Sequence, residues 1–250
     1  MVRVPTSHFI FMTAFLSAHS APPRAIFHQL NDHQRDQREN LQKIKKNKDI
    51  CFEKQQHCMI DKVKILKTEI LSDNWYTLKK ITYEYEKNNG AKQIQTREAY
   101  DRGNGATILL FNKEQRTVIL TKQFRLPTFI NGNASGMLIE ACAGLLDHDN
   151  PEDCIRRETE EETGYKIKDV RKIFEAYMSP GSVTEILYFF IAEYSSSMKI
   201  GDGGGVEREE ENIEVLELNF DKAINMLASG EIKDAKTIML LQYIKLNKIL

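Results

Sequence analysis

The fold is decided by residues 144–164, GLLDHDNPEDCIRRETEEETG, which a glycine opens and another glycine closes. Asn150 is a favourable N-cap, and Pro151 suits the first position of a helix. Gly164 is typical of the residue that ends a helix in the left-handed conformation. The stretch therefore predicts a loop and then a helix with a defined start and end, which fixes the register of its carboxylates.

Three carboxylates lie on one side of this helix. Glu158, Glu161 and Glu162 are spaced i, i+3 and i+4, so their side chains project together and repel each other. A hard divalent cation that prefers oxygen ligands removes this repulsion, which favours Mg²⁺.

The alternative is an ordinary solvated acidic face with ion pairs along the helix. Such a face would pair Arg156 with Glu160 and Arg157 with Glu161. The apolar strand and glycine-opened loop that precede the helix favour a carboxylate face directed toward a cleft.

The stretch resembles the Nudix box, a glycine loop followed by a helix bearing Arg-Glu-x-x-Glu-Glu-x-Gly. The matching residues are Gly144, Arg157, Glu158, Glu161, Glu162 and Gly164. The interval from Gly144 to Arg157 is one residue shorter than usual, and Asn150 stands where a glutamate is common. The resemblance implies a Mg²⁺-dependent hydrolase and an α/β fold, a Nudix-type α/β/α sandwich with a mixed sheet.

The rest of the chain agrees with a mixed α/β architecture. Alternating or continuous apolar residues predict strands over 106–111, 117–123, 137–143, 170–177, 186–194 and 213–218. Helical periods cover 220–227 and 235–249. We take 103–250 as the Nudix hydrolase domain.

A small antiparallel sheet is predicted before it, over residues 59–102. Asn88-Asn89-Gly90 is a hairpin signal between strands 81–85 and 94–100, and a turn at 72–74 precedes a strand at 75–78. A sheet of this size is too small to be stable alone. Its aromatic residues favour an interface, so we expect a homodimer.

Residues 1–58 show no apolar period and are very polar from Asn31 to Asp49, so we expect a poorly ordered extension. The segment 1–21 resembles a signal peptide in part, so a secreted protein is the alternative to a cytoplasmic one. Cys51, His57 and Cys58 form a weak candidate metal cluster, and reduced thiols are the simpler interpretation. The net charge of −1 and the lack of a long apolar run argue against nucleic-acid and membrane partners.

A closer resemblance covers roughly residues 60–250. The segments DRGNGA (101–106), QFR (123–125), CAGLLD (142–147) and YMSPGSVTE (177–185) are similar to the bacterial GDP-mannose pyrophosphatases, relatives of the ADP-ribose pyrophosphatases. This resemblance implies cleavage of the pyrophosphate bond of a nucleoside diphosphate sugar, with GDP-mannose giving GMP and mannose 1-phosphate. An ADP-ribose or ADP-sugar pyrophosphatase and a non-catalytic Nudix-fold binding module are the alternatives.

The resemblance also implies residue roles. Metal ligands would be the carbonyl of Ala143, Glu158, Glu162 and a glutamate of the loop 206–213. Alignment on the following strand makes that glutamate Glu211, which we prefer, and alignment on Gly203-Gly204-Gly205 makes it Glu209, with Glu210 between them. The expected catalytic residues are Glu162, Glu161 and Glu209, since a loop glutamate can accept a proton.

The implied substrate-binding residues are Trp75, Arg97, Glu98, Arg125, Glu185 and Lys236. Arg125 and Lys236 would hold phosphates. Arg97 and Glu98, with Trp75 of the partner chain, would hold the base. Residue type alone favours a core position for Trp75 and a strand-surface position for Arg97.

Overall fold

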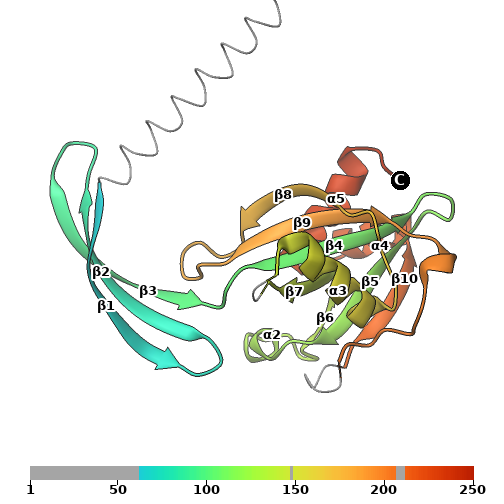
Figure 1. Ribbon diagram of the computed structural model, residues 1–250, viewed down its shortest axis with the longest axis horizontal. Coiled ribbons are helices and arrows are strands. Elements are labelled where there is room, and N and C mark those ends of the chain that lie inside the picture. The colour runs from blue at the N-terminus through green and yellow to red at the C-terminus, as the bar shows by residue number, and fades with distance from the viewer. Residues whose placement is uncertain (1–61, 147–148, 207–211) are drawn as a thin grey trace, which may run out of the picture. The chain divides into compact units, whose positions relative to one another are not determined.

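The computed structural model describes residues 62–146, 149–206 and 212–250. The extension, the cluster around Cys51 and Cys58, and the candidate glutamates Glu209, Glu210 and Glu211 lie outside the described residues. The elements are β1 Val63–Asp73, β2 Thr77–Glu86, β3 Lys92–Asp101, β4 Gly105–Asn112, β5 Thr117–Phe124, α2 Leu126–Ile130, β6 Met137–Glu140, β7 Cys142–Leu145, α3 Pro151–Thr163, β8 Arg171–Tyr177, β9 Ile186–Glu193, η1 Ser196–Met198, β10 Glu214–Asn219, α4 Phe220–Ala228 and α5 Ala235–Leu246 (Figure 1).

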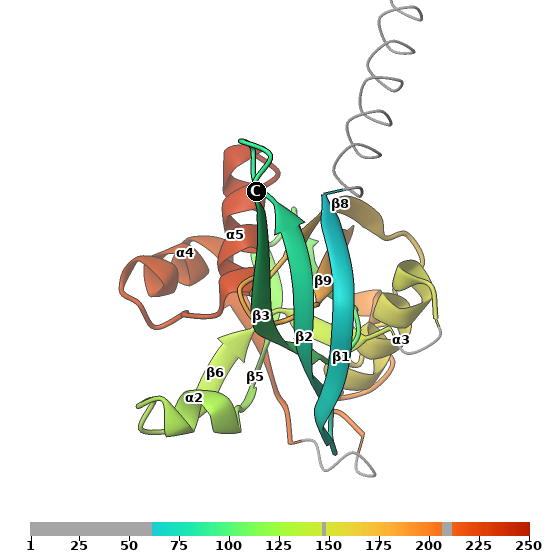
Figure 2. The ribbon, with the colours of Figure 1, turned by 90° about the vertical axis from the view of Figure 1, so that its left-hand side faces the viewer.

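The first three strands form an antiparallel sheet in the order β1-β2-β3 (Figure 2). The predicted hairpin is confirmed, because β2 and β3 pair from Thr77↔Asp101 to Glu86↔Lys92, and Gly90 takes a φ of 79° in the turn between them. The expected strand at 75–78 is wrong at its start. Trp75 and Tyr76 lie in the bend between β1 and β2, because β1 continues through the polar residues expected to form the turn.

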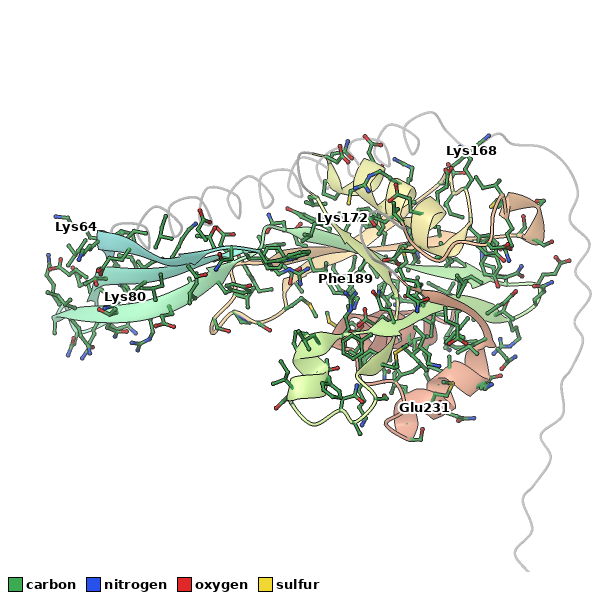
Figure 3. All side chains as sticks on the ribbon, turned by 90° about the horizontal axis from the view of Figure 1, so that it is seen from below. Lys64, Lys80, Lys168, Lys172, Phe189 and Glu231 are labelled. Carbon is green, nitrogen blue, oxygen red and sulfur yellow. The ribbon has the colours of Figure 1, made fainter. Side chains whose placement is uncertain are left out.

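The larger sheet has seven strands, with a central order β10-β5-β4-β9-β8 and with β6 on β5 and β7 on β4. It is mixed, since β4 runs parallel to β9 and antiparallel to β5. Helix α3 covers one face, and α4 and α5 cover the other, with Phe189 between the sheet and the α4–α5 layer (Figure 3). The expected α/β/α sandwich is confirmed.

Strand β4 shows why the sheet needs two covering layers. All of its residues are buried, and alternate side chains enter opposite cores. Leu109 and Phe111 pack in the core beneath α4 and α5, whereas Ile108 and Leu110 pack in the core that contains Ile155 of α3. The continuous apolar run in the sequence is therefore the signature of a strand buried on both faces.

The single strand expected over 137–143 is two strands, β6 and β7, separated at Ala141. The backbone N–H of Ala141 donates to Oγ1 of Thr237, at 2.7 Å, in the first turn of α5. The chain leaves β5 at this point and continues beside β4. An apolar run cannot reveal such a change of partner, because both segments are apolar.

One short helix and one helix end also differ from expectation. Helix α2 was not predicted, because five residues are too few to show a helical period. Helix α5 ends at Leu246 instead of continuing toward Ile249, with Asn247 as its C-cap and Lys248 at a positive φ of 52°. None of the helices in the described residues combines the length and the apolar composition that a membrane span requires.

Candidate active site

The caps of α3 hold the register of its carboxylates as the sequence predicts. Oδ1 of Asn150 accepts hydrogen bonds from the backbone N–H groups of Glu152, at 3.1 Å, and Asp153, at 3.0 Å. Such a cap contributes about 1 kcal/mol to helix stability. Gly164 ends the helix at a φ of 75°, and a Cβ there would lie 2.2 Å from the carbonyl oxygen of Gly201.

Two of the three glutamates leave the solvated face of the helix. Glu162 is 2% exposed and shares the buried side of α3 with Ile155 and Thr159. The carboxyl of Glu158 lies against the backbone of Gly144, where a Cβ would be 2.1 Å from Cδ of Glu158. Gly144 is not among the residues with positive φ, so the site requires a glycine here for space. The first glycine of the box and the first glutamate of the helix therefore form one unit.

Arg157 lies between three carboxylates of the box, those of Glu158, Glu161 and Asp149. Its Nη1 lies 3.0 Å from Oε1 of Glu158 and 3.1 Å from Oε2 of Glu161, and its Nε lies 3.7 Å from Oδ2 of Asp149. The predicted Arg157–Glu161 pair is thus present. Because the same Nη1 also contacts Glu158, Arg157 orients both glutamates and is more than half of a surface ion pair.

The other predicted pair is wrong. Arg156 pairs with Glu152, at 3.0 Å, and with Asp153, at 3.1 Å, because both lie one turn toward the N-terminus. Glu160 pairs with Lys166 at 3.3 Å. The interpretation as a solvated acidic face therefore applies to this side of α3, while Glu158 and Glu162 lie on the side toward the sheet and β7.

Crowded carboxylate oxygens suit a divalent cation. Glu158 and Glu162 come from successive turns of α3, and Glu158 lies against Gly144, the residue after Ala143. Among the described residues, no three His, Cys, Asp or Glu side chains form a ready-made metal cluster. The third glutamate expected from the sequence belongs to residues 207–211, outside the described part.

The segment that leads into that loop is bonded to the end of α3. The N–H of Gly204 donates to the carbonyl of Glu162 at 2.9 Å, and the N–H of Gly205 donates to that of Glu161 at 3.2 Å. Gly203 has a φ of 70°, and a Cβ there would lie 2.4 Å from the carbonyl oxygen of Glu162. Residues 203–205, which precede the candidate glutamates in the sequence, therefore lie beside the C-terminal end of the helix that carries Glu158 and Glu162.

The two expected phosphate-binding cations converge on a residue that the sequence analysis missed. Arg125 donates from Nε to Oε1 of Glu140, at 3.1 Å, and from Nη2 to Oε2, at 2.8 Å. Lys236 donates to the same Oε2 at 3.1 Å and to Asp234 at 3.0 Å. The sequence does contain a signal for this cluster. Glu140 is a single carboxylate within the apolar run 137–143, and a buried charge needs a partner.

The electrostatics connect this cluster with the carboxylates of α3. Burial would raise the pKa of Glu140, but Lys236 and Arg125 outweigh it and lower that pKa. Burial would likewise lower the pKa of Arg125, but Glu140 and then Glu162 more than offset it. Arg125 thus lies within the electrostatic reach of both Glu140 and Glu162.

Comparisons with known proteins agree with this geometry. Residues 101–241 match the family model described as the NUDIX domain, and residues 62–100 match the one described as the GDP-mannose pyrophosphatase NudK N-terminal domain. The chain belongs to the Nudix hydrolases.

Three relatives illustrate how similar the chain is to one branch of the Nudix hydrolases. It is 59% identical over 186 residues to the GDP-mannose pyrophosphatase of Yersinia pestis (strain Pestoides F), covering 74% of this chain and 93% of the relative. It is 57% identical to that of Yersinia enterocolitica, covering 76% and 98%. It is 56% identical to that of Salmonella arizonae, covering 77% and 100%.

Glu185, one of the expected substrate-binding residues of this Nudix hydrolase, lies beside the box. Glu185 is 8% exposed, and its Oε1 lies 3.7 Å from Nη1 of Arg102. A Cβ on Gly105 would be 3.3 Å from Oε1 of Glu185 and 3.1 Å from the carbonyl oxygen of Gly144. Glu185 is therefore close to the glycine that begins the box.

The expected base-binding residues are not brought to the carboxylates by any contact among the described residues. Trp75 is 84% exposed and meets Tyr76 edge to face, with ring centroids 6.4 Å apart. Arg97 and Glu98 are exposed on β3, where Arg97 donates to the carbonyl of Thr96. Trp75 is therefore not a core residue of this chain.

Proposed function

We propose that this Nudix hydrolase cuts the pyrophosphate bond of GDP-mannose and releases GMP and mannose 1-phosphate, with Mg²⁺ as its cofactor. The observation that carries the proposal is the Glu158 carboxyl against Gly144, with the buried Glu162 one turn further along α3. A binding module without catalysis would have no need for this arrangement. The GDP-mannose pyrophosphatases at 56–59% identity favour this substrate.

The residues that would hold Mg²⁺ are the carbonyl of Ala143, Glu158, Glu162 and Glu211. When bound, Mg²⁺ would neutralise the diphosphate oxygens and lower the pKa of a water molecule. Arg157 holds Glu158 and Glu161 in place, and Glu209 would accept a proton from the attacking water. Hydrolysis then adds one water across the bridging P–O bond, which leaves two monophosphates.

The cations have a separate task, which is to bind the substrate. Arg125 and Lys236 would hold the phosphate oxygens, because guanidinium and ammonium groups form strong charge-assisted hydrogen bonds with phosphates. Glu185, beside Gly144, would accept hydrogen bonds from sugar hydroxyl groups. This assignment separates metal binding on α3 from substrate binding on β5, the 184–185 segment and α5.

The substrate assignment is tested by a panel that compares kcat/KM for GDP-mannose and ADP-ribose in Mg²⁺. We expect GDP-mannose to be preferred. A preference for ADP-ribose would instead identify the protein as an ADP-ribose pyrophosphatase. Absence of turnover with every nucleotide sugar in the panel would support a non-catalytic binding module.

We further propose a homodimer formed through the three-stranded sheet. This sheet carries a high density of exposed apolar side chains, namely Val63, Ile65, Leu66, Ile70, Leu71, Trp75 and Ile94. Exposed apolar residues gathered in this way mark an interaction surface. In the dimer, Trp75 of one chain would meet the guanine bound by the other, together with Arg97 and Glu98.

Replacement of Trp75 by alanine tests the composite site. Stacking of a base on an aromatic ring contributes roughly 1–3 kcal/mol, so Trp75→Ala should raise KM far more than it lowers kcat. Steady-state kinetics and light scattering on the same samples provide the measurement. An unchanged KM, or a fully active wild-type monomer, would contradict the proposal.

The domain limits are proposed as an extension over 1–58, a dimerisation sheet over 59–102 and a hydrolase domain over 103–250. The family models, which match residues 62–241, support this division. A chain that begins at Met59 should melt and turn over like the full chain. A clear fall in Tm or rate on truncation would show that the extension is structural. We also propose a reducing, cytoplasmic location, which the buried free thiol of Cys142 supports.

A further inference from the structure

Glu140 joins three elements of the hydrolase at one carboxylate. It ends β6, Arg125 follows β5, and Lys236 lies in the first turn of α5. The side chain of Glu140 is 3% exposed, compared with 13% for Lys236 and 41% for Arg125. Both cations therefore have a buried anchor while their own outer faces are more accessible.

The hydrogen bonds show which donors remain for a ligand. Arg125 uses Nε and Nη2 for Glu140, and no group of the described residues accepts a hydrogen bond from its Nη1. Lys236 has three N–H donors and gives two of them, to Glu140 and to Asp234. Nη1 of Arg125 and one N–H of Lys236 are thus held in place by the protein, and no hydrogen-bond acceptor among residues 62–146, 149–206 and 212–250 uses them.

Hydrogen bonds at the start of α5 hold this helix next to Glu140 and its two cations, a group that we call the Glu140 junction. Asp234 accepts hydrogen bonds from the N–H of Thr237, at 3.0 Å, and from its hydroxyl, at 2.6 Å. The Thr237 hydroxyl oxygen accepts from the N–H of Ala141, the residue next to Glu140, at 2.7 Å. Thr237 therefore connects the first turn of α5 to the β6–β7 break, next to Glu140.

We propose that Glu140 is a positioning residue for the diphosphate of the substrate, which it does not itself touch. Its role is to hold Arg125 and Lys236 at a fixed separation and orientation. This inference rests on the proposed phosphate-binding role of these two cations. A carboxylate close to an anion-binding site weakens binding through its charge. The carboxylate of Glu140 nevertheless stabilises the site, because Arg125 and Lys236 repel each other and both bond to it.

Two variants of Glu140 separate positioning from simple charge neutralisation. Glu140→Gln removes the charge and keeps the length, whereas Glu140→Asp keeps the charge and shortens the side chain by one methylene. Positioning predicts that both raise KM for GDP-mannose by at least roughly tenfold, the usual effect of losing a hydrogen bond to a charged group. We expect kcat to change much less in both. If Glu140 acted by charge alone, Glu140→Gln would lower KM and Glu140→Asp would match the wild type.

Thr237→Val provides the structural control. It removes the hydroxyl bonds to Ala141 and to Asp234, changes no charge and keeps the bonds of Glu140 to Arg125 and Lys236. It should therefore lower Tm and leave KM near the wild-type value. A KM increase in Thr237→Val as large as in the Glu140 variants would overturn the proposal, because the effect would then come from a loosened α5.

A binding measurement separates this proposal from the proposed activity. Calorimetric titration with inorganic pyrophosphate in Mg²⁺ requires no turnover and can be performed even if GDP-mannose is not the substrate. We expect the full wild-type chain to bind pyrophosphate, Thr237→Val to bind it equally well, and both Glu140 variants to bind it at least roughly tenfold more weakly. No binding to the wild type, or equal binding to all four proteins, would overturn the positioning role.

Discussion

Glu162→Gln should lower the turnover of this Nudix hydrolase roughly 10²- to 10³-fold, the usual effect of removing one preorganised electrostatic group. The carboxylate is 2% exposed and shares the buried side of α3 with Thr159. Glutamine has nearly the same shape, so packing and melting temperature should be retained while one charge at the proposed metal site is lost.

Glu160→Gln is the matched control for this variant. Glu160 lies on the same helix, but it pairs with Lys166 on the exposed side. Exposed ion pairs contribute little, so kcat/KM and Tm should both remain near the wild-type values. A Glu162→Gln enzyme that keeps a wild-type rate with fully bound Mg²⁺ would disprove the assignment of Glu162 as a ligand.

Gly144→Ala should produce a loss of similar size through a different cause. The added methyl group would occupy the position of the Glu158 carboxyl, 2.1 Å from Cδ, so Glu158 must move away from β7. A displacement of about 1 Å at a reacting centre can lower the rate about 10²-fold. The measurement is kcat as a function of Mg²⁺ concentration, and the Mg²⁺ needed for half-maximal rate should rise as well.

Gly201→Ala controls for the general effect of a glycine substitution. A Cβ at Gly201 meets nothing within 4 Å, and its φ is not positive, so this variant should behave as the wild type. If Gly144→Ala retained full activity at low Mg²⁺, the close contact between Gly144 and Glu158 would have no catalytic importance.

The helix of the box could be predicted from sequence because its signals are local. Asn150, Pro151 and Gly164 define its limits, and the spacing of Glu158 and Glu162 then follows from helix geometry. The alternating apolar residues of the sheet are equally local. These features require no knowledge of distant contacts.

The Glu140 junction could not be predicted in the same way. Its partners lie 15 and 96 residues away, at Arg125 and Lys236, and no local pattern specifies such pairs. The break at Ala141 likewise involves a distant residue, since the N–H of Ala141 bonds to the hydroxyl of Thr237. Arg125 and Lys236 were named from a family resemblance, and only the structure shows that they share one anchor.

The position of Trp75 illustrates a different limit. Aromatic and β-branched residues around it indicated a strand, but β1 continues to Asp73 and places Trp75 in the bend. Side-chain preference is a weak guide at strand ends, because tertiary pairing decides where a strand stops.

Product analysis with GDP-mannose tests the central claim most directly. The full chain is incubated with GDP-mannose, with and without Mg²⁺, and the nucleotide and sugar products are resolved separately. We predict equimolar GMP and mannose 1-phosphate, formed only when Mg²⁺ is present. Formation of GDP and free mannose, or equal turnover without any divalent cation, would contradict cleavage of the pyrophosphate bond at a metal site on α3.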